Sequence, residues 1–398
     1  MEKFATSEEM NQNNRHSQNR EKIIAAEKIF SYENLLKQYY QCRKRKRNTI
    51  NAIKFEMNLE NELLKLQKEL ETQIYNPGRS IYFVVTKPKP REIFAAGFRD
   101  RVVHHVLVDY LEPIWEPKFI DQSYSCRKKR GAHKAIEDLK KYLRIITNNH
   151  RRPAYYLQLD IRSFFMSLDK DILFALINKR VKNSKVLWLA KKIIFHDPTT
   201  NYYCKSKMSL LKLIPSHKSL FGVAKSQGLP IGNLTSQFFA NVYLNEMDQF
   251  VKHQLKIKYY LRYVDDLVIL SENKEELKIW RDRIDKFLQE KLKLKLHPQK
   301  QILQEVNKGI NFVGGIIRMD YVLMRKRVIN NLRQRLLNFN QCPITTREML
   351  STINSYYGQF KNCNTFHLRK KLWHKNFNEL NNIFIPVDSN FSYFKIKQ

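Results

Sequence analysis

The sequence predicts an α+β protein. Several segments have apolar residues at helical spacing, and between them lie short runs of β-branched, aromatic and aliphatic residues that are typical of strands. The clearest strands are residues 155–161 and the two runs that flank Tyr263-Val264-Asp265-Asp266. At 398 residues, the chain can bury a large core and form two or three subdomains.

The elements follow one another without an internal repeat, after a polar N-terminal stretch of about 20 residues. The expected helices are 22–41, 50–73, 99–112, 134–144, one from Lys170, one in the first part of 182–226, one in 227–244 and 273–291. The expected strands are 81–85, 155–161 and the hairpin 257–270, with a β-turn element at 309–315. A Lys-rich connector fills the rest of 182–226, and the last 75 or so residues are helical and basic.

The charge balance indicates a polyanionic partner. Lys plus Arg is 72 and Asp plus Glu is 38, so the net charge is +34, which favours nucleic acid over the alternative of a membrane surface. No apolar run reaches the length of a transmembrane helix, and the N-terminus lacks a secretory core. The five cysteines form no Cys-x-x-Cys pair, which argues against zinc and disulfide frameworks and favours a cytoplasmic protein.

Asp265 and Asp266 are adjacent carboxylates between two apolar strands. Two like charges about 4 Å apart repel by roughly 4 kcal/mol at an effective dielectric of about 20. A divalent metal offsets such repulsion best, whereas the simpler alternative is a solvated hairpin turn.

Asp160 lies at the end of another apolar strand, about a hundred residues earlier. Carboxylates at the ends of adjacent antiparallel strands can converge on one edge of a sheet, where they would hold two Mg²⁺ ions for in-line phosphoryl transfer. Mn²⁺ can replace Mg²⁺ at such a site. At this point a polymerase and a nuclease are both open.

The order of several motifs resembles the reverse transcriptases, from about residue 30 to about residue 375. The block Lys87–Ile93 is similar to the fingers segment that holds the incoming triphosphate, which implies phosphate contacts by Arg91 with Lys87 or Lys89. The block Leu159–Phe165 is similar to the first catalytic motif. It implies that Asp160 binds metal, that Ile161 offers its carbonyl, and that Phe165 excludes the ribose 2′-hydroxyl.

Tyr263–Asp266 resembles the Tyr-x-Asp-Asp motif of the same family, with Asp265 as the principal metal ligand, Asp266 as the third carboxylate and Tyr263 at the nucleotide. Lys300 is similar to a late-palm lysine that protonates pyrophosphate, so it is a candidate catalytic residue. The segment 312–315 looks like the primer grip, with Gly314 against nucleic acid.

The resemblance implies a right-hand polymerase fold. The expected divisions are a polar extension (1–30), fingers with N-terminal helices (31–155), a palm (156–318) and a helical thumb with its tail (319–398). Basic residues expected at nucleic acid are Arg127, Lys128 and Arg130 before a helix N-terminus, and Arg325, Lys326 and Arg327 in the thumb. We expect no room for a ribonuclease H, endonuclease or maturase domain after the thumb.

The stretch Leu229–Gln237 narrows the resemblance. Most reverse transcriptases have Gln-Gly, three residues, then Ser-Pro, whereas this chain has Ile231-Gly232, three residues, then Ser236-Gln237. That variant resembles the reverse transcriptases of diversity-generating retroelements, as do residues 44–105 and 355–365. It implies nucleotide contacts by Ile231, Gly232 and Gln237.

Members of that family are bacterial or phage-encoded and copy a template-repeat RNA into cDNA with errors opposite adenines, a process called mutagenic retrohoming. The resemblance therefore implies template RNA, the RNA/cDNA duplex and dNTPs as ligands, and a small basic ring-forming accessory protein as a partner. Ile231 offers no hydrogen bond where a glutamine could orient the nucleotide, a contact worth about 1 kcal/mol.

Four alternatives stay open. Ile231 can serve core packing alone, and Gln227-Gly228 offers another register for the motif, although the downstream residues 240–244 favour Ile231-Gly232. The enzyme can be a retron-type or phage-defence reverse transcriptase, against which the Ser236-Gln237 pair argues. A catalytically silent RNA-binding scaffold is the fourth, but all three aspartates are present.

Overall fold

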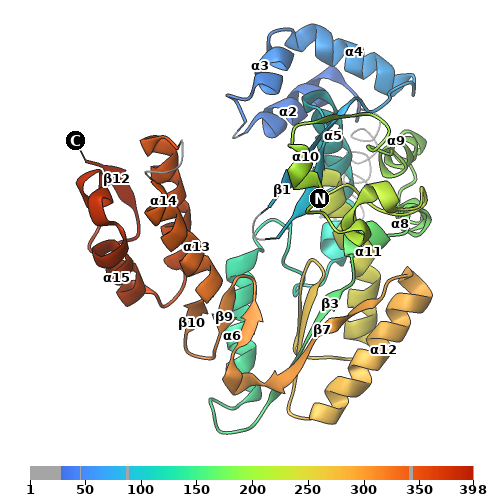
Figure 1. Cartoon of the computed structure of the whole chain (residues 1–398). Coiled ribbons are helices and arrows are strands. Elements are labelled where there is room, and N and C mark those ends of the chain that lie inside the picture. Colours follow the sequence, from blue (N-terminus) through green and yellow to red (C-terminus); the bar gives the residue numbers. More distant parts are fainter. Residues whose placement is uncertain (1–27, 45, 87–88, 340–343, 398) are drawn as a thin grey trace, which may run out of the picture. The chain divides into compact units, whose positions relative to one another are not determined.

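The computed structural model describes residues 28–44, 46–86, 89–339 and 344–397 (Figure 1). It confirms the α+β class. The chain divides into two compact units, one made of Met1–Ile120, Ile161–Gln254 and Ile284–Leu296, the other of Asp121–Asp160, Leu255–Arg283 and His297–Gln398. Among the described residues, no helix has the length and apolar character needed to cross a membrane.

Unit 1 is mainly helical and carries one small sheet. Its helices are α2 (Tyr32–Arg43), α3 (Ile50–Glu56), α4 (Leu59–Glu71), α5 (Phe98–Trp115), α7 (Phe164–Ser167), α8 (Lys170–Asn178), α9 (Ser184–Ile194), α10 (Met208–Leu211) and α11 (Leu234–Gln249). Its strands β1 (Ser80–Val85), β2 (Arg91–Ala95) and β4 (Tyr202–Cys204) form a sheet in the order β2-β1-β4. Helix α5 is central because both α2 and α11 pack on it.

Unit 2 is built on a four-stranded sheet in the order β5-β6-β3-β7. Its strands are β3 (Tyr155–Ile161, which passes into unit 1 at its last residue), β5 (Tyr260–Tyr263), β6 (Asp266–Ser271) and β7 (Leu296–Glu305). Strands β8 (Ile310–Phe312), β9 (Gly315–Ile317) and β10 (Val322–Met324) form a second sheet, in the order β10-β9-β8. Helix α12 (Lys274–Leu292) begins in unit 2 and ends in unit 1.

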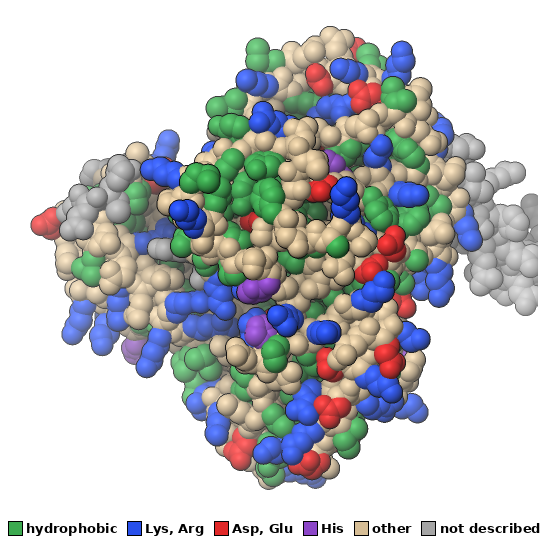
Figure 2. Space-filling view, turned by 45° about the vertical axis from the view of Figure 1, so that its right-hand side comes forward, with side chains coloured by type: hydrophobic (Ala, Val, Ile, Leu, Met, Phe, Trp, Pro, Cys, Tyr) green, Lys and Arg blue, Asp and Glu red, His purple; other side chains and the backbone are tan. Residues whose placement is uncertain are grey.

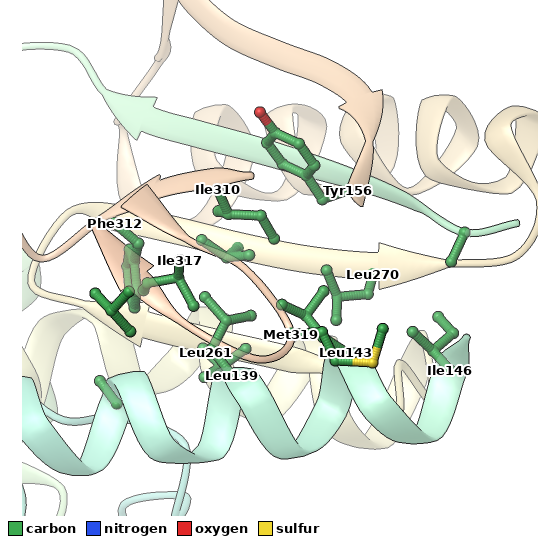
Figure 3. Packing of buried hydrophobic residues seen from close by; sticks show 14 of the residues in the cluster. Leu139, Leu143, Ile146, Tyr156, Leu261, Leu270, Ile310, Phe312, Ile317 and Met319 are labelled. Atoms are coloured by element: carbon green, nitrogen blue, oxygen red, sulfur yellow. The ribbon is translucent and has the colours of Figure 1, made fainter. Parts of the chain in front are cut away.

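One core of unit 2 lies between helix α6 (Ala132–Ile146) and these sheets (Figure 3). Leu139 and Leu143 of the helix pack with Leu261 of β5, Leu270 of β6 and Phe312 of β8. The helical spacing of the first two and the alternation of buried residues along the strands place each apolar face inward. This core fixes the backbone of β3, β5 and β6, which carry or flank the predicted carboxylates.

A second core of unit 2 belongs to the C-terminal helices. It is formed by α13 (Lys326–Leu337), α14 (Thr346–Phe360), α15 (Phe366–Asn376) and the strands β11 (Phe384–Pro386) and β12 (Phe394–Ile396). Thr345 and Glu348 form a capping box that begins α14. The expected helical C-terminal region is therefore present, with a small hairpin added, whereas the predicted fingers, palm and thumb boundaries stay a prediction.

Two predicted helices differ in extent. Residues 22–27 of the helix predicted at 22–41 lie outside the described residues. Among the described ones, α2 begins at Tyr32, where the Ser31 hydroxyl accepts a hydrogen bond from the Asn34 amide. The segment predicted at 50–73 is interrupted: α3 ends at Glu56 and α4 begins after Asn58. Asparagine competes for backbone hydrogen bonds in a helix interior, which favours an end there.

Candidate active site

The structure brings Asp160 and Asp266 together. Strands β3 and β6 are antiparallel, and these two aspartates are direct partners in their register. Side chains of paired residues lie on the same face of a sheet, with Cβ atoms about 5 Å apart. Asp265 is in the two-residue turn between β5 and β6 rather than at a strand end, since Tyr263 pairs directly with Asp266.

The environment of Asp266 disfavours its charge. Burial, together with the nearby carboxylates of Asp265 and Asp160, raises the pKa of Asp266 to about 7, although a hydrogen bond from Gln158 and the guanidinium of Arg325 oppose this shift. The Gln158 side chain donates to the Asp266 carboxylate at 2.9 Å and to the Asn311 carbonyl at 3.0 Å. Asp266 is thus close enough to Asp160 and Asp265 to be repelled by both.

The chemistry of this group suits a hard divalent cation. Mg²⁺ prefers carboxylate oxygens, binds one or two of them and keeps several waters. Lys300 forms an ion pair with Asp160, so a cation at Asp160 would compete with that ammonium group. Among the described residues, no three His, Cys, Asp or Glu side chains are gathered so as to hold a metal ion, and the metal roles of Asp160, Ile161, Asp265 and Asp266 therefore stay a prediction.

Arg262 holds the turn that carries Asp265. Its side chain is fully buried, and it donates to the Val264 carbonyl at 3.1 Å and to the Ser123 hydroxyl at 2.8 Å. Backbone bonds join Arg262 to Gln122 and Tyr124 as well. Val264 has a φ of 57°, which is unfavourable for a β-branched residue, so the buried guanidinium stabilises a strained backbone.

In unit 1, the two residues predicted to select the nucleotide share one hydrophobic cluster. Phe165 and Ile231 are both partly buried against Tyr82, Phe94, Met166 and Leu220. Backbone hydrogen bonds hold both residues in this part of the fold. The Leu229 amide donates to the Phe165 carbonyl at 2.8 Å, and the Phe94 amide donates to the Ile231 carbonyl at 3.0 Å. Residues 66 positions apart therefore belong to one packed unit.

Other predicted nucleotide contacts lie in this unit, except for Tyr263. Gly232 and Gln237 are exposed, and Gly232 has a φ of 121°, with Ile93 so close that an added Cβ would meet its Cγ2 at 2.6 Å. Lys89 and Arg91 are exposed, whereas Lys87 lies outside the described residues. Tyr263 is in unit 2, where its ring packs edge-on against Phe312.

The predicted nucleic-acid residues of unit 2 differ in their surroundings. Arg127 donates to the Ser123 carbonyl at 2.8 Å and Arg130 pairs with Asp121, so both help to fix the loop before α6, while Lys128 is exposed. Arg325 is half-buried at the start of α13, and Lys326 and Arg327 are exposed.

Gly314 and Val313 form the turn between β8 and β9, both with positive φ, as expected for a tight hairpin.

Sequence reasoning missed Gln158 and Arg262. Gln158 lies two residues before Asp160, so strand alternation places it on the same face, and a polar residue there is a usable signal. Arg262 is a charged residue inside the otherwise apolar run 259–263. Because arginine is almost never fully buried without a partner, its position there was a signal that its side chain has one.

The family comparison supplies the class of protein. Residues 85–317 match the family model described as reverse transcriptase (RNA-dependent DNA polymerase), which is more than half of the chain. The chain belongs to the reverse transcriptase family.

The relatives with similar sequences include two bacterial proteins, one of which is named as intron-encoded. The chain is 26% identical over 312 residues to protein YkfC of Escherichia coli, covering 70% of this chain and 75% of that protein. It is 22% identical over 326 residues to the group II intron-encoded protein LtrA of Lactococcus lactis, covering 65% of this chain but only half of LtrA. A solved structure of apo telomerase from Candida tropicalis is similar with a TM-score of 0.44 and 13% identity, covering 75% of this chain and 61% of that one.

Proposed function

We propose that this chain is an RNA-directed DNA polymerase that copies a template-repeat RNA into cDNA with errors at adenines, as in a diversity-generating retroelement. The observation that carries the polymerase part is the pairing of Asp160 with Asp266 beside Asp265. The retroelement part is supported by the Ile231-Gly232 and Ser236-Gln237 pairs.

In this proposal, the chain's own residues organise the reacting groups. Asp160, Asp265 and Asp266 would hold Mg²⁺, which when bound supplies electrostatic stabilisation of the charge that develops during phosphoryl transfer. Gln158 keeps the Asp266 carboxylate in place, and Arg262 keeps the turn in place. Lys300, an exposed ammonium paired with Asp160, is suited to donate a proton to pyrophosphate as it leaves.

Selection of the nucleotide would come from unit 1. The Phe165 ring would exclude a ribose 2′-hydroxyl, while Ile231 would leave the base with one orienting hydrogen bond fewer. A missing hydrogen bond worth about 1 kcal/mol changes discrimination several-fold, so Ile231 contributes to adenine errors together with other features. A small basic ring-forming accessory protein would be the second factor.

The experiment that tests this proposal is sequencing of cDNA made by the purified chain on a primed RNA. The experiment has two arms, one with the accessory protein added and one without it. We expect substitutions concentrated opposite template adenines. Uniformly accurate cDNA in both arms would contradict the retroelement part and leave the polymerase part standing. No cDNA in either arm would contradict both.

An intron-type or retron-type reverse transcriptase is the second candidate. It is favoured by one observation, namely the similarity of the chain to LtrA, whose name describes a group II intron-encoded protein. Accurate copying of a structured RNA would support this candidate. The two candidates share the carboxylate site, so only the error pattern and the template distinguish them.

A further inference from the structure

The Lys-rich connector of unit 1 has an unusual charge pattern. Residues 198–226 contain five lysines and no Asp or Glu. All five lysine side chains are exposed, and none of them forms an ion pair or a side-chain hydrogen bond with another described residue. These lysines are Lys205, Lys207, Lys212, Lys218 and Lys225. Figure 2 shows that acidic side chains elsewhere on the visible surface are interspersed among the basic ones.

Aromatic side chains lie among these lysines. Tyr203 is 56% exposed and Phe221 is 49% exposed. The Arg79 guanidinium lies over the Tyr203 ring, 5.7 Å from its centre. Exposed rings beside unpaired cations are the combination that single-stranded nucleic acid uses, because bases stack on the rings while phosphates meet the cations. A duplex keeps its bases stacked internally and would need no exposed ring.

The connector is firmly attached at its beginning. Strand β4 pairs in parallel with β1, with Tyr203 opposite Ile81. The Lys205 amide donates to the Tyr82 carbonyl at 2.8 Å, and the Val84 amide donates to the Ser206 hydroxyl at 2.9 Å. Lys205 and Lys207 therefore flank a residue that is bonded to β1.

The end of the connector is fixed by a buried carboxylate. Glu92 of β2 is 1% exposed and accepts hydrogen bonds from the Ser219 hydroxyl, at 2.9 Å, and from the Leu220 amide. The Phe221 ring packs against Tyr82 and Phe94, with ring centres 5.5 and 5.7 Å apart. Lysines on a segment whose backbone is held in place lose less conformational freedom on binding than lysines on a mobile loop.

After β4 the connector continues toward the end of the sheet where Arg91 lies. Because β4 runs parallel to β1, the chain leaves β4 in the direction of the β1–β2 loop, where Val85 pairs with Arg91. We infer that the connector surface, defined by Arg79, Tyr203, Lys205, Lys207, Lys212 and Lys218, binds single-stranded RNA. The inference rests on the proposed function in one respect, that the bound strand is the uncopied part of the template.

The test compares two RNA probes in fluorescence anisotropy with the full chain: a blunt primer–template duplex and the same duplex with a 12-nucleotide 5′ single-stranded extension on the template. The variant changes Lys205, Lys207, Lys212 and Lys218 to Gln. The matched control changes four other exposed lysines to Gln, namely Lys65 and Lys68 of α4 and Lys286 and Lys291 of α12.

We expect the connector variant to bind the extended probe at least tenfold more weakly, with little change for the blunt duplex. Each lost phosphate contact lowers the slope of log Kd against log salt by about 0.7, so loss of two to four contacts lowers it by about 1.4 to 2.8. Equal losses on both probes, or an equal loss in the control variant, would overturn the inference.

A second variant, Tyr203→Leu, removes a ring without removing charge. Its affinity for the extended probe should fall about fivefold or more, with the salt slope unchanged. Unchanged affinity would exclude stacking on Tyr203 and overturn that part of the surface. Single-nucleotide incorporation by the wild-type chain on a duplex whose template extends one nucleotide beyond the primer reports separately on the proposed function.

Discussion

The buried Arg262 side chain donates a hydrogen bond to the Val264 carbonyl at 3.1 Å, and Val264 has a left-handed backbone. A single arginine thus braces the turn in which Asp265 lies, and through Ser123 it ties this turn to the segment before α6. The tetrapeptide that carries two of the predicted catalytic aspartates is therefore held from the residue just before it, by a side chain that is fully buried.

Replacing Arg262 by Met should cost both stability and turnover. The partly buried Val264 carbonyl and the buried Ser123 hydroxyl lose their donor, which lowers the free energy of unfolding by about 2 kcal/mol or more. We expect kcat to fall about 10- to 100-fold because the turn is no longer held, with a smaller change in KM for dNTP, since the predicted nucleotide contacts lie mainly in unit 1. Arg262→Lys should recover part of the loss and Ser123→Ala should show the smallest effect. A folded Arg262→Met protein with wild-type kcat would refute this role.

Phe165→Ala should admit ribonucleotides. Removal of the ring removes the steric clash with the 2′-hydroxyl, so the preference for dNTP over rNTP should fall about tenfold or more. Primer extension with each nucleotide, resolved on a gel, measures this ratio. Phe165→Tyr keeps the ring and serves as the control. If Phe165→Ala still rejects rNTPs as the wild type does, the ring is not the sugar gate.

Ile231→Gln should lower errors at template adenines by about three- to tenfold, the range expected for one regained hydrogen bond. The measurement is deep sequencing of cDNA made on an adenine-rich RNA. Ile231→Val, which keeps an apolar side chain, controls for altered packing against Phe94 and Tyr82. An error spectrum that is the same in all three proteins would assign Ile231 to packing alone.

Glu92→Gln should reveal a pH-dependent cost of burying a carboxylate. Burial raises the pKa of Glu92 above its ordinary value near 4.5, despite hydrogen bonds from Leu220 and Ser219. The folded state then binds the proton more tightly than the unfolded state, so this group makes stability fall as pH rises above about 4.5.

Glutamine can accept from the Leu220 amide and donate to the Ser219 hydroxyl, so we expect Glu92→Gln to be at least as stable as the wild type at pH 7, with the difference vanishing toward pH 4. Thermal unfolding at several pH values measures this. Glu92→Ala, which leaves the Leu220 amide unpaired, should instead lose about 1 to 3 kcal/mol. A Glu92→Gln protein less stable than the wild type at pH 7 and equal to it at pH 4 would contradict the sign.

Local pattern was sufficient for much of the fold. The strand predicted at 155–161 coincides with β3, because five of its seven residues are aromatic or aliphatic. The hairpin around the tetrapeptide was also predicted. The interruption at Asn58 was not, since apolar spacing continues across it, whereas asparagine is a weak helix former and the break falls there without a side-chain capping hydrogen bond.

Long-range contacts set the limit for the site. Hydrogen bonds join Gln158 to Asp266, 108 residues apart, and Ser123 to Arg262, 139 residues apart. Neither hydrogen bond can be predicted from sequence periodicity, because each depends on which segments pair and in which register. The convergence of Asp160 with the tetrapeptide was expected because carboxylates at the ends of adjacent antiparallel strands can meet at one sheet edge, and the order of motifs then supported it.

The most direct test of the central claim, that Asp160, Asp265 and Asp266 form one catalytic group, is incorporation of dNTP on a primed RNA by Asp265→Asn. The substitution keeps the size of the side chain and removes its charge, so folding and RNA binding should persist while incorporation is abolished. Incorporation at the wild-type rate by Asp265→Asn would contradict the account.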